Sequence, residues 1–133
     1  GKMAVPAEIL SKPSQLTDAE FGLIKEHPRI AYEMLTAVEF IEPVATIIVQ
    51  HHERLDGSGY PHKLKGEAIT RAARILAAAD VVEAMASHRP YRPALGVDAA
   101  LRELDDHKGT LYDPTVVNAC IALFAEDGFA FAE

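Results

Sequence analysis

Helix-start signals recur along this chain of 133 residues and constrain its fold more than any other sequence feature. The segment Thr17-Asp18-Ala19-Glu20 is a capping box, in which Thr17 and Glu20 satisfy each other's free backbone donors at the start of a helix. Pro28 and Pro43 suit the first turn of two further helices, and Asp113-Pro114 is a capping residue followed by proline at the first helical position. Strand signals are almost absent. The pattern predicts an all-α fold with no sheet of more than two short strands.

The helical spacing of apolar residues extends these starts into about six helices. We expect helices over residues 17–26, 28–35, 44–53, 70–87, 97–107 and 114–125, one short turn at 6–10, and irregular loops at 55–69 and 88–96. No repeat, low-complexity tract or linker divides the chain, so residues 1–133 are predicted to belong to one domain.

The net charge of −7 restricts the ligands that the chain can bind. It argues against nonspecific binding of a nucleic-acid polymer or a membrane surface, and an anionic ligand needs a local site of opposite charge. Cys120 is the single cysteine, which excludes an intrachain disulfide framework and fits a reducing compartment. The longest apolar run, residues 119–125, is too short to span a bilayer. We therefore expect a cytoplasmic protein with no membrane contact by this segment.

Asp80 is the first residue whose position suggests chemistry. Its neighbours three and four residues away include Leu76, Ala77 and Ala84, so the carboxylate stands on a small, apolar helix face. A buried carboxylate on such a face costs several kcal/mol unless it is paired or bound to a metal. Two interpretations stay open: a buried aspartate paired with arginine or a backbone donor, and a metal ligand.

Histidines are the second feature. His51 and His52 are adjacent, and adjacent helical residues point about 100° apart, so the two imidazoles are expected to serve neighbouring ions or to divide into one ligand and one supporting residue. A structural or exposed pair is the alternative. His27 lies just before Pro28, where its side chain could face a cavity. With Asp80, these histidines suit a transition-metal site of nitrogen and oxygen donors, whereas a Cys-type zinc site is excluded. The histidines that we expect to be solvated are His62, His88 and His107.

Two loops carry further candidates. In the segment 51–61, Gly57 and Gly59 permit close backbone approach and Pro61 stiffens the exit, although a plain surface turn has the same composition. The segment Arg89-Pro90-Tyr91-Arg92 follows the helix that carries Asp80. Its two guanidinium groups could clamp phosphate oxygens or stack on a base, or could pair with some of the twenty acidic residues.

The order of these segments resembles the HD-GYP family, a branch of the HD phosphohydrolases that hydrolyses cyclic di-GMP. The matching segments are 1–2, 5–6, 9–10, 12–13, 16–17, 27–28, 51–54, 56–61, 64–67, 73–75, 79–80, 87, 89–92 and 113–114. The resemblance covers nearly the whole chain, and the ordered set of motifs is specific, whereas a single Gly-Tyr-Pro at 59–61 would be a weak signal.

The resemblance implies an HD-domain-like helical bundle that holds two or three divalent transition-metal ions, iron or manganese above all. The ligands that it implies are His27, His51, His52 and Asp80. It places Lys2 beside the scissile phosphate as a catalytic residue, and it places Tyr60, Arg89 and Arg92 near the bound dinucleotide. Clustered cations lower the pKa of a bridging water and stabilise charge on the phosphoryl oxygens. The implied products are the linear dinucleotide, GMP, or both.

One departure from the family pattern outweighs the others. The family's His-Asp pair stands just before a Gly-Lys, and here Gly1 is the first residue. We therefore expect residues 1–133 to form the C-terminal major part of an HD-GYP domain that is N-terminally truncated, with low metal affinity and little activity by itself. Smaller departures are Glu83 and His88, where the family commonly has aspartates.

Two alternatives to a cyclic di-GMP phosphodiesterase stay open. One is a degenerate, noncatalytic HD-type signalling module that binds a nucleotide or a partner domain. The other is an HD hydrolase that acts on a different nucleotide. The partners that we consider besides cyclic di-GMP are a regulatory or diguanylate cyclase domain and a second copy of the chain.

Overall fold

The computed structural model describes residues 1–88, 93–126 and 129–131. Within these ranges the chain is helical, and the only β contact is an isolated bridge between Lys108 and Tyr112. The elements are η1 (Lys2–Ala4), α1 (Ala7–Leu10), α2 (Asp18–Lys25), α3 (His27–Leu35), α4 (Val44–Gln50), η2 (Gly66–Ala68), α5 (Arg71–Ala86), α6 (Val97–Asp106) and α7 (Pro114–Ala125), where η denotes a 3-10 helix. The predicted all-α fold is confirmed. Among these helices none has the length and apolar character needed to cross a membrane.

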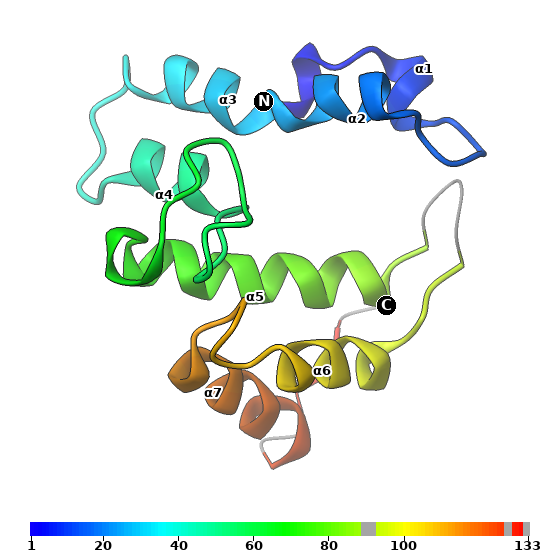
Figure 1. The fold of residues 1–133 in the computed structure, drawn as a ribbon, viewed down its shortest axis with the longest axis vertical. Coiled ribbons are helices and arrows are strands. Elements are labelled where there is room, and N and C mark those ends of the chain that lie inside the picture. Colours follow the sequence, from blue (N-terminus) through cyan, green and yellow to red (C-terminus); the bar gives the residue numbers. More distant parts are fainter. Residues whose placement is uncertain (89–92, 127–128, 132–133) are drawn as a thin grey trace.

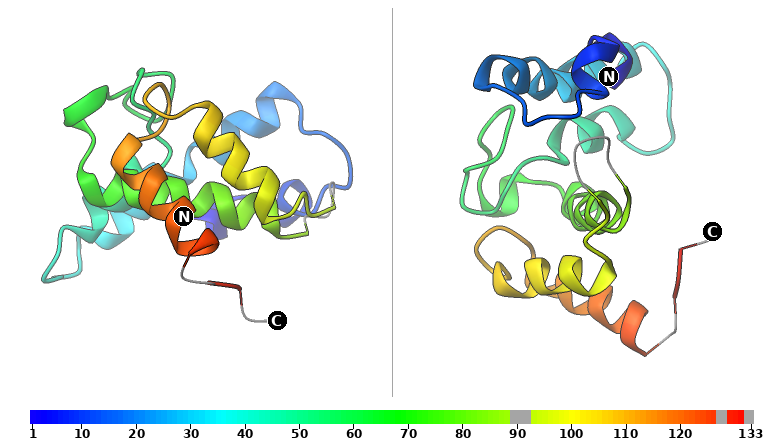
Figure 2. Two further views of the ribbon diagram at one scale, coloured as in Figure 1. Left: turned by 90° about the horizontal axis from the view of Figure 1, so that it is seen from below. Right: turned by 90° about the vertical axis from the view of Figure 1, so that its right-hand side faces the viewer.

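The helices lie in three tiers, with α5 in the middle (Figure 1). In that view α1 to α4 lie above α5, and α6 and α7 lie below it; the side view in Figure 2 shows the same order. Helix α4 packs on α5 from one side, and α6 and α7 pack on it from the other. Helix α3 packs on α4 and on η1, which brings the N-terminal residues next to the start of α3.

The hydrophobic core lies between α5, α6 and α7. Its buried residues are Ala78, Val82, Ala100, Leu104, Tyr112, Val116 and Val117. Full burial of side chains such as Leu104 and Val117 contributes about 1.5–3 kcal/mol each. This cluster therefore occupies one side of α5, while Ala31 of α3 and Val49 of α4 are buried on the side that also holds the polar site.

Helix starts follow the capping signals in the sequence. The Thr17 hydroxyl accepts a hydrogen bond from the Glu20 N–H at 3.3 Å, and the Glu20 carboxylate accepts one from the Thr17 N–H at 2.7 Å. The predicted capping box is thus confirmed. The Asp113 carboxylate likewise accepts from two backbone N–H groups in the first turn of α7. Helices α5, α6 and α7 begin and end within one residue of their predicted bounds.

Helix α4 ends earlier than predicted, at Gln50 rather than near Glu53. The Glu53 N–H donates to the Gln50 carbonyl at 2.9 Å in a tight turn, and the His52 carbonyl accepts from the Tyr60 N–H at 3.2 Å. The His52 carbonyl thus bonds to the following loop, whereas in a longer helix it would bond to the next helical turn. His51 and His52, which were expected within this helix, therefore lie in the turn that follows it.

Candidate metal centre

Three histidines from two parts of the sequence form a cluster between α3 and α4. His27 is the first residue of α3, and His51 and His52 follow the end of α4. One ring nitrogen of each lies within 4.8 Å of the other two. The ring centroids are 5.6 Å apart for His27 and His51, 5.1 Å for His27 and His52, and 3.9 Å for His51 and His52. Nitrogens at this separation can bind one ion or two adjacent ions.

Backbone carbonyls orient two of the three rings. The Nδ1–H of His27 donates to the Ile24 carbonyl at 2.7 Å, and the Nδ1–H of His51 donates to the Ile48 carbonyl. Because a carbonyl can only accept, Nδ1 carries the proton and Nε2 keeps its lone pair. Metal-binding histidines have this arrangement, in which one nitrogen binds the ion and the other donates to a carbonyl or carboxylate. The Nε2 atoms of His27 and His51 are thus available to bind a metal ion.

Burial keeps the imidazoles neutral. It lowers the pKa of His27 and of His51, and it lowers the pKa of His52 to about 2, with the neighbouring histidines acting in the same direction. A neutral imidazole is the form that binds metal, so the three nitrogens are available at neutral pH without competition from protons.

We expect the free energy of unfolding of the metal-free protein to fall as the pH drops below 6.5, the ordinary imidazole pKa. Since burial lowers the imidazole pKa values in the folded state, the unfolded chain binds protons that the folded chain does not, and acid favours unfolding. For His52 this loss continues towards pH 2. Urea unfolding at about pH 7.5 and 5.5 measures the effect above the range where most carboxylates titrate. The difference should shrink in His52→Asn, and equal stability at the two pH values would contradict this account.

Asp80 reaches the cluster from α5. Its Oδ2 lies 3.9 Å from Nδ1 of His52, so the four side chains predicted as ligands lie together. The Asp80 side chain is 32% exposed, and the expectation of a buried aspartate is wrong because this face of α5 opens towards the histidines. Within the described ranges, the Asp80 carboxylate pairs with no lysine or arginine and accepts no hydrogen bond. The described residues thus offer the Asp80 carboxylate neither the arginine nor the backbone donor that the interpretation as a structural aspartate requires.

Tyr60 and Lys2 border the histidines. The Tyr60 ring lies 4.8 Å from the His52 ring, and burial raises the pKa of Tyr60 to about 12, so the phenol keeps its proton at neutral pH. Lys2 lies in η1, and its positive charge contributes to the lowered pKa of all three histidines. The backbone before Lys2 is pressed against α3, since a Cβ on Gly1 would lie 2.0 Å from the His27 carbonyl oxygen. This contact keeps Lys2 beside the cluster.

The other residues singled out from the sequence lie apart from the cluster or outside the description. Arg89 and Arg92 lie outside the described residues, so their contact with a dinucleotide stays a prediction. His62 and His88 are exposed, as expected. His107, the C-cap of α6, keeps 43% of its side chain exposed while its ring donates to the Glu103 carbonyl at 3.0 Å.

Two buried polar residues flank the histidine pair, and neither of them has a role predicted from the sequence. Gln50 is 8% exposed and accepts the Thr70 N–H at 2.9 Å, which ties the cluster to the start of α5. Glu53 is 2% exposed and accepts the N–H groups of His62 and Leu64 at 2.7 and 2.9 Å. The sequence signal for such residues is a polar side chain on each side of the histidine pair, at the end of an apolar helix.

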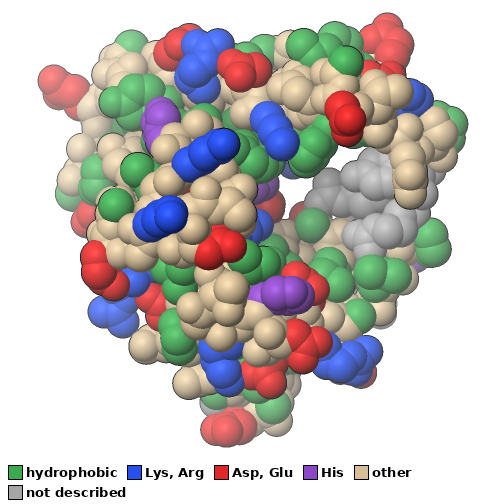
Figure 3. Space-filling view, in the orientation of Figure 1, with side chains coloured by type: hydrophobic (Ala, Val, Ile, Leu, Met, Phe, Trp, Pro, Cys, Tyr) green, Lys and Arg blue, Asp and Glu red, His purple; other side chains and the backbone are tan. Residues whose placement is uncertain are grey.

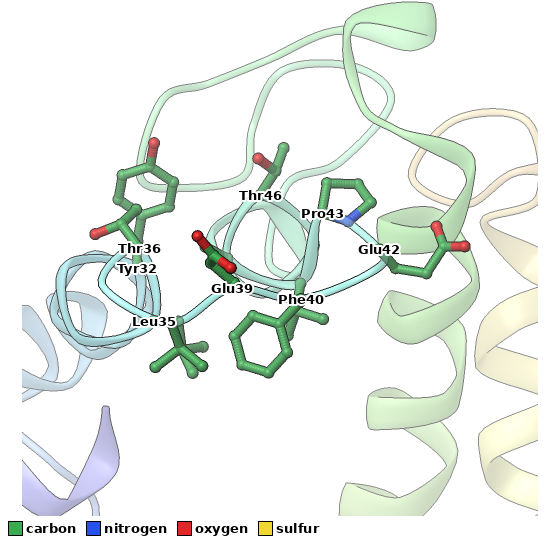
Figure 4. Close-up of a pocket in the computed structure, with 11 residues that line it drawn as sticks. Tyr32, Leu35, Thr36, Glu39, Phe40, Glu42, Pro43 and Thr46 are labelled. Atoms are coloured by element: carbon green, nitrogen blue, oxygen red, sulfur yellow. The ribbon is translucent and has the colours of Figure 1, made fainter.

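Two pockets among the described residues lie away from the histidines. One of about 460 Å³ lies between the end of α3 and the start of α4, where Tyr32, Glu39 and Phe40 are among the lining residues (Figure 4). Another of about 440 Å³ lies between α5 and α7. No predicted site residue lines either pocket. In the space-filling view, by contrast, histidine and basic side chains appear beside a hollow between the upper tier and α5 (Figure 3).

Comparison with known proteins gives consistent matches. The family model described as an HD domain matches residues 1–116. The chain is 50% identical over 123 residues to the cyclic di-GMP phosphodiesterase response regulator RpfG of Xanthomonas campestris, a match that covers 91% of this chain and 32% of the relative. It is 42% identical over 130 residues to a cyclic di-GMP phosphodiesterase of Vibrio cholerae, covering 92% of this chain and 26% of the relative.

A third relative acts on a different dinucleotide. The chain is 35% identical over 114 residues to the 3′3′-cGAMP-specific phosphodiesterase 3 of Vibrio cholerae, which covers 86% of this chain and 25% of that protein. The chain therefore spans between a quarter and a third of the length of these relatives.

Proposed function

This chain belongs to the HD domain family, within its HD-GYP branch, and we propose that the protein carrying it is a metal-dependent phosphodiesterase that hydrolyses cyclic di-GMP. The observation that carries the proposal is the cluster of His27, His51 and His52, which Asp80 joins from α5. Neutral, oriented imidazoles beside a carboxylate are donors for divalent metal ions. The names of the relatives support a cyclic dinucleotide as substrate.

The donor set fits iron or manganese, since imidazole nitrogen suits iron and carboxylate oxygen suits manganese. The ligands in this chain would be His27, His51, His52 and Asp80, and the number proposed from the family is two or three ions. When bound, such ions lower the pKa of a water and stabilise charge on phosphoryl oxygens.

The other site residues bind and orient the dinucleotide in this proposal. Lys2 supplies a positive charge for the scissile phosphate, which the chain's net charge of −7 would otherwise repel. Tyr60, protonated at neutral pH, can donate a hydrogen bond or stack on a base. Arg89 and Arg92 are proposed to contact the dinucleotide from their loop. Hydrolysis adds hydroxide to phosphorus and a proton to the leaving 3′ oxygen, which gives the linear dinucleotide, and a second hydrolysis gives GMP.

Four further points belong to this proposal. We propose a cytoplasmic location, a regulatory or diguanylate cyclase domain as a partner, and assembly with a second copy of the chain. We also expect the 133 residues alone to hydrolyse little cyclic di-GMP, because the family's His-Asp pair supplies further ligands that they lack.

A different cyclic dinucleotide is the second candidate substrate. The 3′3′-cGAMP-specific relative favours it, since that protein matches most of this chain. A competition assay that offers cyclic di-GMP and 3′3′-cGAMP together would rank the two by kcat/KM.

Hydrolysis by the purified full-length protein tests the proposal directly. Cyclic di-GMP is incubated with the protein and Mn²⁺ or Fe²⁺, and the linear dinucleotide and GMP are separated by chromatography. Metal-dependent product formation is the expected result. Binding of cyclic di-GMP without hydrolysis would favour the noncatalytic alternative, and hydrolysis of neither dinucleotide would contradict the proposal.

Replacing Tyr60 with phenylalanine should raise KM for cyclic di-GMP by about two- to tenfold with little change in kcat, because one neutral hydrogen bond is lost and the ring remains. Tyr32→Phe is the matched control, since Tyr32 lies on α3 and lines the pocket remote from the histidines. Steady-state kinetics of both variants measure the effect. If the KM of Tyr60→Phe equals that of the unchanged protein, the Tyr60 hydroxyl does not contribute to dinucleotide binding.

A further inference from the structure

Glu53 is a buried acidic residue that the proposed reaction does not use. It is 2% exposed, and its two carboxylate oxygens accept separate backbone hydrogen bonds, from His62 N–H at 2.7 Å and Leu64 N–H at 2.9 Å. Its carboxylate pairs with no cation in the described ranges. A buried carboxylate is costly unless such bonds compensate it, so the two amides are what keeps Glu53 inside.

These bonds close the loop that carries Tyr60. Glu53 stands at the start of the loop, and His62 and Leu64 stand at its end. Between them, the Tyr60 N–H donates to the His52 carbonyl at 3.2 Å, and the Tyr60 ring lies 4.8 Å from the His52 ring. The closure leaves no space beside the backbone before Tyr60.

The glycine before Tyr60 shows how tight the closure is. A Cβ on Gly59 would lie 2.5 Å from the His52 carbonyl oxygen, the Glu53 Cα and the Arg54 nitrogen. All three are backbone atoms, which cannot rotate away as a side chain can. The position of Tyr60 therefore depends on how the two ends of the loop are held together, and Glu53 holds them.

We propose that Glu53 is a positioning residue, which fixes the Tyr60 ring against His52 and thereby sets the affinity for the dinucleotide. This inference rests on the proposed function for its effect on substrate, although the placement of Tyr60 can be measured without any reaction. Glu53→Gln is the informative change, because glutamine keeps the size but offers one acceptor oxygen and turns an NH₂ group towards a backbone N–H.

Gln50 provides a matched control. It is buried at 8% exposure, lies on the other side of the histidine pair, and also binds one backbone N–H, that of Thr70. Gln50→Leu removes a buried hydrogen bond of the same kind without touching the loop of Tyr60. A loss of stability common to both variants therefore cannot be mistaken for a displaced Tyr60.

The first measurement is ¹⁹F NMR of the metal-free, full-length protein labelled with 3-fluorotyrosine. The chain has four tyrosines, and the Tyr60 resonance is assigned by its disappearance in Tyr60→Phe. We expect this resonance to shift or broaden in Glu53→Gln and to stay in place in Gln50→Leu. An unchanged Tyr60 resonance in Glu53→Gln would overturn the proposal. If Glu53→Gln does not fold, Glu53→Asp, which keeps the charge but is too short to reach both amides, is judged by the same criterion.

The second measurement is a double-mutant cycle on KM for cyclic di-GMP. Glu53→Gln should raise KM about tenfold, and it should add nothing further in a Tyr60→Ala background, because its effect passes through Tyr60. In the control cycle, the fold increases in KM caused by Gln50→Leu and by Tyr60→Ala should multiply in the double variant, because the two residues act independently. Multiplying effects for Glu53→Gln would show an independent, merely structural role and would overturn the proposal. If the unchanged protein hydrolyses nothing while the Tyr60 resonance still moves in Glu53→Gln, the proposed function fails and the positioning role stands.

Discussion

Replacing Asp80 with alanine should lower kcat/KM for cyclic di-GMP by about a thousandfold or more, because it removes a carboxylate that lies beside three neutral imidazoles. With one anionic ligand fewer, less of the positive charge of the ions is compensated, so metal affinity should fall together with turnover. Asp80 makes no ion pair with a described lysine or arginine, and the loss of its carboxylate should therefore change the melting temperature of the metal-free protein little.

The full-length protein is assayed for product release and for bound metal, with Asp98→Ala as the control. Asp98 is an exposed aspartate in the first turn of α6, on the opposite side of α5 from the histidines. This variant should keep its activity and its metal. Retention of both in Asp80→Ala would show that Asp80 is not a ligand, whereas loss of activity with normal metal content would assign it a role in substrate contact instead.

Removing the metal with a chelator should reduce hydrolysis to background, and addition of Mn²⁺ or Fe²⁺ should restore it. The helical circular dichroism should survive the treatment, because the hydrophobic core lies between α5, α6 and α7 and the histidines lie on the other side of α5. Added metal should also raise the melting temperature, since an ion that binds only the folded chain stabilises it by mass action.

Atomic emission spectroscopy checks that the treated protein is free of metal, and chromatography follows the products. His62→Ala is the matched control, because His62 is exposed and lies outside the cluster of three histidines. It should regain activity at the same metal concentration as the unchanged protein, while His51→Ala should need more. Hydrolysis that persists in metal-free protein would contradict the proposed mechanism.

Local signals in the sequence predict most of the helices because the forces involved act over a few residues. The capping box at Thr17 and Glu20 and the cap at Asp113 satisfy backbone donors in the first turn of their own helices, whatever the rest of the chain does. Helices α5 to α7 accordingly match their predicted bounds within one residue. The order of motifs along the chain is likewise a property of the sequence alone, and it is sufficient to indicate the HD-GYP family.

The end of α4 could not be predicted in this way. Helical spacing continues through His51 and His52, but their turn is stabilised by hydrogen bonds from residues farther along the chain, at Tyr60, His62 and Leu64. The exposure of Asp80 could not be predicted either, because helical periodicity shows which residues share a face and does not show what packs against that face.

The sequence by itself determined which helices form and which donor groups the chain carries, since capping and side-chain chemistry are local properties. Only the tertiary structure decided that the donors meet. His27 approaches His51 because α3 packs on α4, Asp80 comes near them because α4 packs on α5, and the loop of Tyr60 closes through buried Glu53. These contacts arise from the packing of apolar faces and from a buried carboxylate that needs donors, and both depend on residues that are distant in the chain.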